Sequence, residues 1–194
     1  MPARVEPLEP PYAEDVALEL SRLMGGSDRP PLLLFRTLAR HLPLARAWGV
    51  LGSHNLGRGA LSVRDRELII LRTCFLNRCE YEWGVHAKVY AKAAGLSPTQ
   101  CDATARQDPG DGFWLAHDRD VLAFADALHA KAAVPGPLLD RLAQHWDEAQ
   151  ILEACEVAGF YHGVAFMANV AGVELEEWAV RFPAAAASGD DAGE

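Results

Sequence analysis

The sequence lacks the features that mark a membrane-spanning or secreted protein. Its 194 residues contain no apolar run of the ~18 residues that a membrane span requires, and the longest run, Leu68 to Leu76, is interrupted by Arg72. Residues 1–11 carry charged side chains but no apolar core of the kind found in a signal peptide. We therefore expect a cytoplasmic protein.

Positive charge is scarce. The chain has 18 Lys and Arg against 27 Asp and Glu, which gives a formal net charge of −9. Proteins that bind nucleic acid use clustered Lys and Arg to displace counterions, and anionic membrane surfaces attract the same residues. The composition argues against nucleic acid and membranes as partners.

Cysteines are few, and none lie in a closely spaced pair. The four are Cys74, Cys79, Cys101 and Cys155. In a reducing compartment this pattern predicts free thiols rather than disulfides. The paired Cys or His spacing of zinc sites does not occur either. We expect no metal ion and no cofactor.

Sustained strand-like alternation is also missing, and no internal repeat of 20–50 residues occurs. Ala and Leu dominate instead, in segments separated by Gly and Pro. Helices are expected over residues 13–24, 44–54, 64–76, 117–131, 137–145, 148–171 and 174–181, with another between Pro31 and Pro43. The fold class predicted is all-α, with about eight to ten helices.

Helix-start signals support several of these segments. Ser62-x-x-Asp65 resembles a capping box with Asp in place of the usual Glu or Gln. Ser97-Pro98-x-Gln100 places Ser at the N-cap and Pro at the first helical position. We expect one domain over residues 13–182, a flexible segment over 1–12 and a disordered tail over 183–194, which has no large apolar residue.

Candidate chemistry concentrates between residues 64 and 95. At about 100° per residue, Cys79, Glu82 and His86 fall within an arc of roughly 60° on one helix face. Cys79 would lie near a helix start, where backbone N–H groups lower a thiol pKa. Glu82 and His86 are four residues apart, and a carboxylate beside an imidazole favours acid/base chemistry.

Glu67 can join this face if the chain reverses direction near Asn77. Residues 67 and 86 are then about equally far from the turn, so an antiparallel helix hairpin would place them level with one another. No Gly or Pro marks such a turn, so a continuous helix is also compatible with the sequence. Glu67 could equally be an exposed residue of a first helical turn, and Glu82 and His86 a pair on a solvated face.

These four residues carry a resemblance. The segment resembles the carboxymuconolactone decarboxylase family with its AhpD-like thiol branch, in which a Glu is followed twelve residues later by Cys-x-x-Cys and then by a His. Glu67, Cys79, Glu82 and His86 occupy those positions. The resemblance implies an AhpD-like all-α fold, a catalytic role for the four residues, and a homo-oligomer.

The departure from the thiol branch is Glu82, which stands at the second Cys position. A two-cysteine redox cycle cannot close there, whereas proton transfer by His86 and Glu82, with Glu67 orienting the imidazole, loses nothing. The favoured hypothesis is a carboxymuconolactone decarboxylase-like lyase acting on a small organic acid or lactone-type substrate. One alternative is an alkylhydroperoxidase or peroxiredoxin-type oxidoreductase using Cys79; the other is a non-catalytic helical oligomer.

Overall fold

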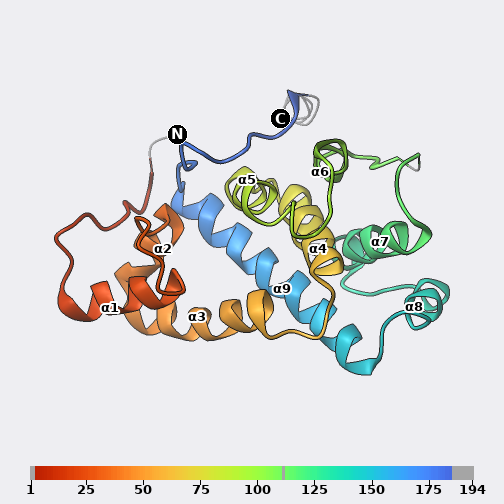
Figure 1. Ribbon diagram of the computed structural model, residues 1–194, viewed down its shortest axis with the longest axis horizontal. Coiled ribbons are helices and arrows are strands. Elements are labelled where there is room, and N and C mark those ends of the chain that lie inside the picture. The colour runs from red at the N-terminus through yellow and green to blue at the C-terminus, as the bar shows by residue number, and fades with distance from the viewer. Residues whose placement is uncertain (1–2, 111, 185–194) are drawn as a thin grey trace. The chain divides into compact units, whose positions relative to one another are not determined.

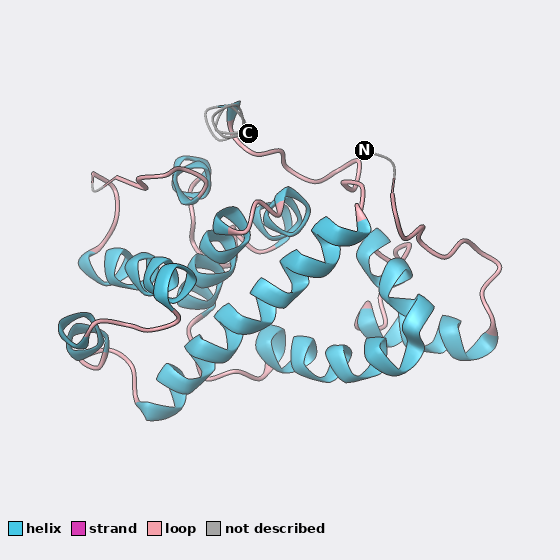
Figure 2. Cartoon of the chain, turned by 180° about the vertical axis from the view of Figure 1, so that it is seen from behind, coloured by secondary structure: helices cyan, strands magenta, loops and turns pink. Residues whose placement is uncertain are grey.

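The computed structural model describes residues 3–110 and 112–184, and over these residues the protein is all-α, as predicted (Figure 1). The helices are α1 (Glu14–Leu23), α2 (Leu33–Leu38), the short 3-10 helix η1 (Ala39–His41), α3 (Leu42–Gly57), α4 (Val63–Leu76), α5 (Glu80–Val89), α6 (Pro98–Thr104), α7 (Ala116–Lys131), α8 (Gly136–Leu142) and α9 (Glu148–Ala171). Figure 2 shows helices and loops only in the described part of the chain.

The chain divides into two compact units. The first comprises residues 1–59 and 167–177, and the second comprises residues 60–166 and 178–194, each over its described part. Helix α9 contributes residues to both units, and the second unit contains α4 to α8. The single domain expected over residues 13–182 stays a prediction.

The N-terminal segment is attached to the first unit. The sequence predicts flexibility over residues 1–12, but the amides of Arg4 and Val5 donate to the carbonyl of Ala171, and the amide of Leu8 donates to the carbonyl of Arg36. These bonds satisfy backbone groups that would otherwise need water. Of the tail expected over 183–194, residues 185–194 lie outside the described residues.

The helix-start signals are confirmed. The Ser62 hydroxyl accepts a hydrogen bond from the amide of Asp65. Ser97 and Gln100 form a full capping box, in which each side chain accepts from the other residue's amide. Asp147 and Gln150 pair in the same way at the start of α9. Side-chain acceptors thus satisfy the unpaired donors at three helix starts.

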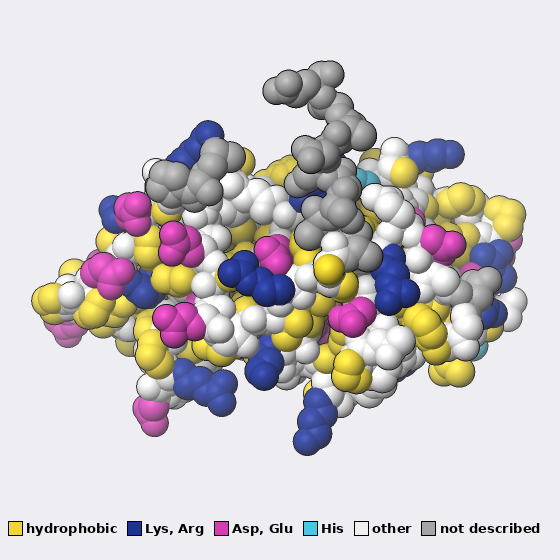
Figure 3. Space-filling view, turned by 90° about the horizontal axis from the view of Figure 1, so that it is seen from above, with side chains coloured by type: hydrophobic (Ala, Val, Ile, Leu, Met, Phe, Trp, Pro, Cys, Tyr) yellow, Lys and Arg dark blue, Asp and Glu magenta, His cyan; other side chains and the backbone are white. Residues whose placement is uncertain are grey.

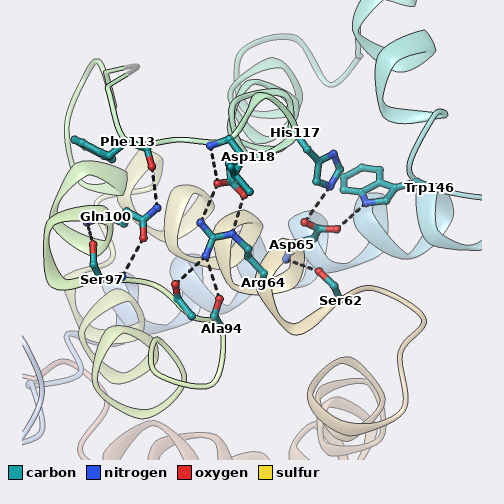
Figure 4. Close-up of polar contacts among 12 residues, drawn as sticks. Ser62, Arg64, Asp65, Ala94, Ser97, Gln100, Phe113, His117, Asp118 and Trp146 are labelled. Carbon is teal, nitrogen blue, oxygen red and sulfur yellow. Dashed lines mark hydrogen bonds and ion pairs between the residues drawn. The ribbon is translucent and has the colours of Figure 1, made fainter.

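Helix α4 forms the centre of the second unit. Its residues 68–71 are completely buried, as the apolar run predicts. Charged side chains join it to its neighbours: Arg64 pairs with Asp118 of α7, and Arg72 pairs with Asp126 of α7. In Figure 4, Arg64 lies between Asp118 and the carbonyl of Ala94. These contacts fix the helix that carries Glu67.

The predicted helix over residues 174–181 is wrong. Most of this segment is extended or turning, and in the second unit it runs along α5, where the amide of Val180 donates to the carbonyl of Gly84 at 3.3 Å. The ring of Phe182 packs against Trp83, 5.2 Å between ring centroids, and Phe75, 5.8 Å. Gly84 permits this approach, because a Cβ there would lie 2.1 Å from the Val180 carbonyl oxygen. The packing of the half-buried Phe182 on Trp83 and Phe75 outweighs the local helical pattern.

Helix α9 is long and apolar. Among the described helices it alone has the length and composition of a possible membrane span, and 39% of its most apolar window is buried. Core helices of soluble proteins meet the same criteria.

On the face seen in Figure 3, the basic side chains that are drawn lie scattered among acidic ones rather than gathered in a patch.

Candidate active site

The turn between α4 and α5 is a helix C-cap of the Schellman type. The amide of Cys79 donates to the carbonyl of Cys74 at 2.8 Å, and the amide of Arg78 donates to the carbonyl of Phe75 at 2.8 Å. Arg78 has a φ of 53°, in the left-handed region that this motif requires and that Gly usually occupies. The chain therefore reverses after Asn77 without a Gly, and α4 and α5 form a hairpin.

The hairpin brings Glu67, Glu82 and His86 together. Nδ1 of His86 lies 2.7 Å from Oε2 of Glu67, and its Nε2 lies 3.3 Å from Oε1 of Glu82. The imidazole is thus held between two carboxylates, one on each ring nitrogen. All three residues are buried, but the Glu82 side chain is 11% exposed against 0% for Glu67 and 2% for His86. Glu82 is therefore the member of this trio closest to solvent.

The two carboxylates set the charge of the imidazole. Burial alone lowers the pKa of His86, but the charges and hydrogen bonds of Glu67 and Glu82 outweigh it and raise the pKa to about 9. At neutral pH His86 is then an imidazolium, which can donate from both nitrogens at once. The site holds a buried, protonated acid with a carboxylate on either side.

Further side chains fix this arrangement. The guanidinium of Arg66 contacts Oε1 of Glu67 through Nε at 2.9 Å and a second nitrogen at 2.8 Å, which leaves Oε2 for His86. The His86 ring packs against Tyr90, 4.9 Å between ring centroids, and meets the Tyr161 ring edge-on at 5.0 Å. Glu67 is therefore held by a charge-assisted pair on one oxygen and by the imidazole on the other.

The Cys79 thiol differs from the prediction in its burial and its pKa. It is the N-cap residue of α5, as the helix start predicts, but its side chain is completely buried. Burial, reinforced by the nearby charge of Glu82, raises the pKa of the Cys79 thiol to about 12. The expected lowering of this pKa is wrong, because loss of solvation outweighs the backbone hydrogen bonds at the helix start. Cys79 is a neutral thiol at neutral pH.

Two pockets in the described part of the chain lie away from these residues. One of about 560 Å³ is lined by α1 and α3, and one of about 380 Å³ is lined mainly by α7 and α9. Neither includes the four predicted site residues, so a cavity bordered by all four stays a prediction. Within the described residues, no group of three or more His, Cys, Asp or Glu side chains is placed to hold a metal ion.

Sequence reasoning did not assign Arg66 or Tyr90 to this site. Each lies beside a residue that it did assign: Arg66 directly precedes Glu67, and Tyr90 follows His86 by one helical turn. The second spacing is a usable signal, because residues four apart on a helix are neighbours. The contact from Tyr161 depends on the packing of α9, for which the sequence has no comparable signal.

The match to a known family covers the whole hairpin. The sequence model of the carboxymuconolactone decarboxylase family matches residues 43–133, which include all four candidate residues. Over these residues the chain is similar to the carboxymuconolactone decarboxylase family. The resemblance carried by Glu67, Cys79, Glu82 and His86 is thereby confirmed at the level of the family. Among curated proteins, none matches the chain.

Two solved structures of similar fold are described as peroxidase-related proteins. An uncharacterized peroxidase-related protein from Silicibacter sp. TM1040 is 17% identical, with a TM-score of 0.74 over 91% of this chain and 94% of its own. A peroxidase-related protein from Ralstonia eutropha JMP134, described as an alkylhydroperoxidase AhpD core, is 19% identical, with a TM-score of 0.74 over 91% and 95%.

A third similar structure contains a ligand. It is a Cys-to-Ala variant of the debrominase Bmp8 in complex with 2,3,4-tribromopyrrole, 18% identical with a TM-score of 0.71 over 92% of this chain and 94% of its own. At such identities the likeness establishes the AhpD-like fold. The substrate and the reaction of this chain have to come from its own residues.

Proposed function

We propose that the protein is a carboxymuconolactone decarboxylase-like enzyme that transfers a proton to or from a small organic acid or lactone-type substrate. One observation carries the proposal: the buried His86 imidazole is held between the carboxylates of Glu67 and Glu82. An acid/base group needs a fixed orientation and a tuned pKa, and two carboxylates on one imidazole supply both.

The three residues take different roles. Glu67, fully buried and paired with Arg66, orients the imidazole through Nδ1. His86 holds the proton, because its pKa is raised to about 9. Glu82 is nearest to solvent and relays the proton between His86 and the substrate. When CO₂ leaves a carboxylate substrate, an electron pair stays on the remaining carbon skeleton, and protonation by such a relay completes the lyase reaction.

The state of Cys79 supports this ranking over thiol chemistry. The nucleophile in peroxide reduction is the thiolate, and a buried thiol with a pKa of about 12 forms very little thiolate at neutral pH. Glu82 replaces the second cysteine of the thiol branch, so a disulfide within α5 has no partner there.

The test is turnover by matched histidine variants. A panel of small organic acids and lactones is screened for proton release, CO₂ release or ring opening, and the active compound is then used with His86→Gln and His145→Gln. His145 lies in the same unit and is exposed. His86→Gln should lower kcat by about 10²–10⁴-fold while His145→Gln keeps it. Unchanged turnover by a folded His86→Gln variant would show that His86 is not the proton carrier.

A thiol oxidoreductase is the second candidate, and one contact favours it. The helix break at Arg78 places the backbones of Cys74 and Cys79 together, with an N–H to carbonyl distance of 2.8 Å. Cys74, which a continuous helix would turn away, is thus a possible partner for Cys79. Two of the similar structures are also described as peroxidase-related.

Thiol counting before and after hydrogen peroxide separates the two candidates. The proton-transfer enzyme should lose no pair of thiols rapidly. The thiol oxidoreductase would be supported by a rapid and reversible loss of two thiols per chain. Cys79→Ser and Cys74→Ser should each abolish that loss, whereas Cys155→Ser should not. If neither peroxide nor any organic acid is turned over, the non-catalytic helical oligomer gains support.

The expected homo-oligomer is also a proposal. Large apolar side chains of α9 are exposed in the single chain, among them Leu152 at 72% and Phe166 at 58%. A monomeric protein seldom exposes a large apolar patch, so exposed apolar side chains along one helix favour association between copies of the chain. Light scattering coupled to size-exclusion chromatography tests it: Leu152→Glu and Phe166→Glu should both lower the measured mass, and a wild-type monomer would contradict the proposal.

A further inference from the structure

The first unit contains a pocket that the candidate active site does not explain. Its volume is about 560 Å³, within the usual range for small-molecule sites. It is formed by α1, the turn that follows α1, and α3. The residues that carry the argument are Glu19, Arg22, Leu23, Arg46, Val50 and Arg58.

The charges that line this pocket are opposite in sign to the chain as a whole. Three arginines, Arg22, Arg46 and Arg58, line it together with a single acidic residue, Glu19. The protein carries a formal net charge of −9. A local excess of positive charge in such a chain attracts anions, and guanidinium groups match carboxylate and phosphate oxygens in geometry.

Glu19 brings two of the arginines to one place. Its side chain is 5% exposed, and its Oε2 lies 3.4 Å from Arg22 and 3.6 Å from Nε of Arg46. Both distances are long for a charge-assisted hydrogen bond. The two arginine side chains are 63% and 50% exposed, and each guanidinium has five N–H donors, so most of these donors can reach a ligand.

Arg58 adds a third positive charge that Glu19 does not balance. It is the C-cap residue of α3 and is exposed, and it has no ion pair within the described part of the chain. Arg46 and Arg58 come from α3 and its end, whereas Arg22 comes from α1. Two helices therefore present cationic groups to one space.

The packing of α1 on α3 holds the pocket in shape. A Cβ on Gly49 would lie 2.8 Å from Cδ2 of Leu23 and 3.7 Å from Oε1 of Glu19, so the glycine lets the two helices meet closely. Leu23 and the exposed Val50 give the pocket an apolar wall beside its charged groups. The site thus combines a cationic end with an apolar surface.

We propose that this pocket binds a small organic anion, a carboxylate or phosphate ester with a short apolar body. The charged group is held by Arg22, Arg46 and Arg58, and the apolar body lies against Leu23 and Val50. Glu19 keeps Arg22 and Arg46 in place and competes with the ligand for their donors.

Calorimetric titration of the full-length protein tests the proposal with three probes. Inorganic phosphate carries the charged group alone, hexanoate combines a carboxylate with an apolar chain, and hexanamide is its neutral counterpart. Hexanoate or phosphate should bind with an affinity that falls as salt is added, because the arginines are largely exposed. Binding of hexanoate but not phosphate identifies a carboxylate ligand; stronger binding of phosphate identifies a phosphate ester.

Three substitutions sharpen the test. Arg46→Gln should weaken binding about tenfold or more, since a hydrogen bond to a charged group contributes about 1.5–3 kcal/mol. Arg29→Gln removes the same charge from an exposed position that does not line the pocket, and should leave the affinity unchanged. Glu19→Gln should strengthen binding, because it removes the competing carboxylate. Circular dichroism checks that each variant is folded.

Several results would overturn the proposal. One is a failure of both phosphate and hexanoate to bind at concentrations up to about 10 mM, which corresponds to a binding free energy weaker than about −3 kcal/mol. Another is equal binding of hexanoate and hexanamide, which would mean that charge is not recognised. A third is equal weakening by Arg29→Gln and Arg46→Gln, which would indicate a general charge effect.

Discussion

Nδ1 of His86 lies 2.7 Å from Oε2 of Glu67, although the two residues are 19 positions apart in the sequence and belong to different helices. Both side chains are buried, so water has little access to compete for the hydrogen bond between them. Burial alone favours the neutral imidazole, and here the Glu67 carboxylate keeps His86 protonated. The stability and the chemistry of the hairpin therefore depend on the same proton.

The first prediction concerns stability against pH. The folded-state pKa of His86 is about 9 against an ordinary value of 6.5. Protonation of His86 therefore stabilises the fold fully below about pH 6.5, and this contribution is lost as the pH rises through about 9. The free energy of unfolding of the wild type, measured in urea relative to His86→Gln, should fall across this window. A difference that stays constant from pH 6 to pH 10 would contradict the raised pKa.

The second prediction concerns the four thiols. Cys79 is buried and its pKa is raised to about 12, whereas Cys155 is exposed. Iodoacetamide applied to the native protein at pH 8 should modify Cys155 first and leave Cys79 unmodified until the protein is unfolded. Peptide mass spectrometry identifies the modified residue, and Cys155→Ala is the control. Modification of Cys79 before Cys155 would mean that Cys79 is accessible and ionised, and would favour the thiol oxidoreductase.

The fold class and most helix starts could be predicted because they depend on local chemistry. Ser97 and Gln100 cap one helix with their own side chains, and the apolar run of α4 requires burial. The helix predicted over 174–181 does not form, because Phe182 gains more by packing on Trp83 than a short helix gains from its backbone bonds. That contact joins segments about 100 residues apart, and no local pattern records it.

The part of the candidate site that depends on local spacing could also be predicted. The shared helix face of Glu82 and His86 follows from their spacing alone. The position of Glu67 depended on a turn that the sequence leaves open, because Arg78 adopts a conformation usually reserved for Gly. The pKa of Cys79 depended on burial, which outweighs the effect of the helix start.

The third prediction compares two glycines. Gly84→Ala places a methyl group 2.1 Å from the carbonyl oxygen of Val180, so the segment along α5 must move, and we expect destabilisation by about 1–3 kcal/mol. Gly159→Ala lies within α9, where the new methyl group meets no atom within 4 Å beyond its chain neighbours and the backbone of its own helix, and should stabilise the protein by about 0.5–1 kcal/mol. Urea unfolding measures both changes.

Proteolysis is an independent test of the two glycine variants. Arg181 lies in the segment that follows Val180, and its side chain is 71% exposed. Trypsin should cleave after Arg181 faster in Gly84→Ala than in the wild type, because the displaced segment fits the protease more readily, while Gly159→Ala should leave the rate unchanged. Equal cleavage of both variants would show that Gly84 does not hold the segment in place.

The last prediction assigns unequal weight to the two carboxylates that face His86. Glu67 raises the pKa of His86 more than Glu82 does, since it is completely buried, lies closer and accepts the shorter hydrogen bond. Glu67→Gln should therefore lower the pKa of His86 further than Glu82→Gln does. The pKa is read from the ring proton shifts of His86 in an NMR titration, with His86→Gln used to assign the signal. Glu67→Gln also removes the buried carboxylate that pairs with Arg66, so it should cost about 3 kcal/mol of stability or more, whereas Glu82→Gln removes a less deeply buried carboxylate and should cost less. The titration is interpreted only under conditions in which both variants are folded, as shown by circular dichroism. If Glu82→Gln lowers the pKa of His86 as much as Glu67→Gln, the imidazole depends equally on both carboxylates, and Glu67 is not the residue that orients it.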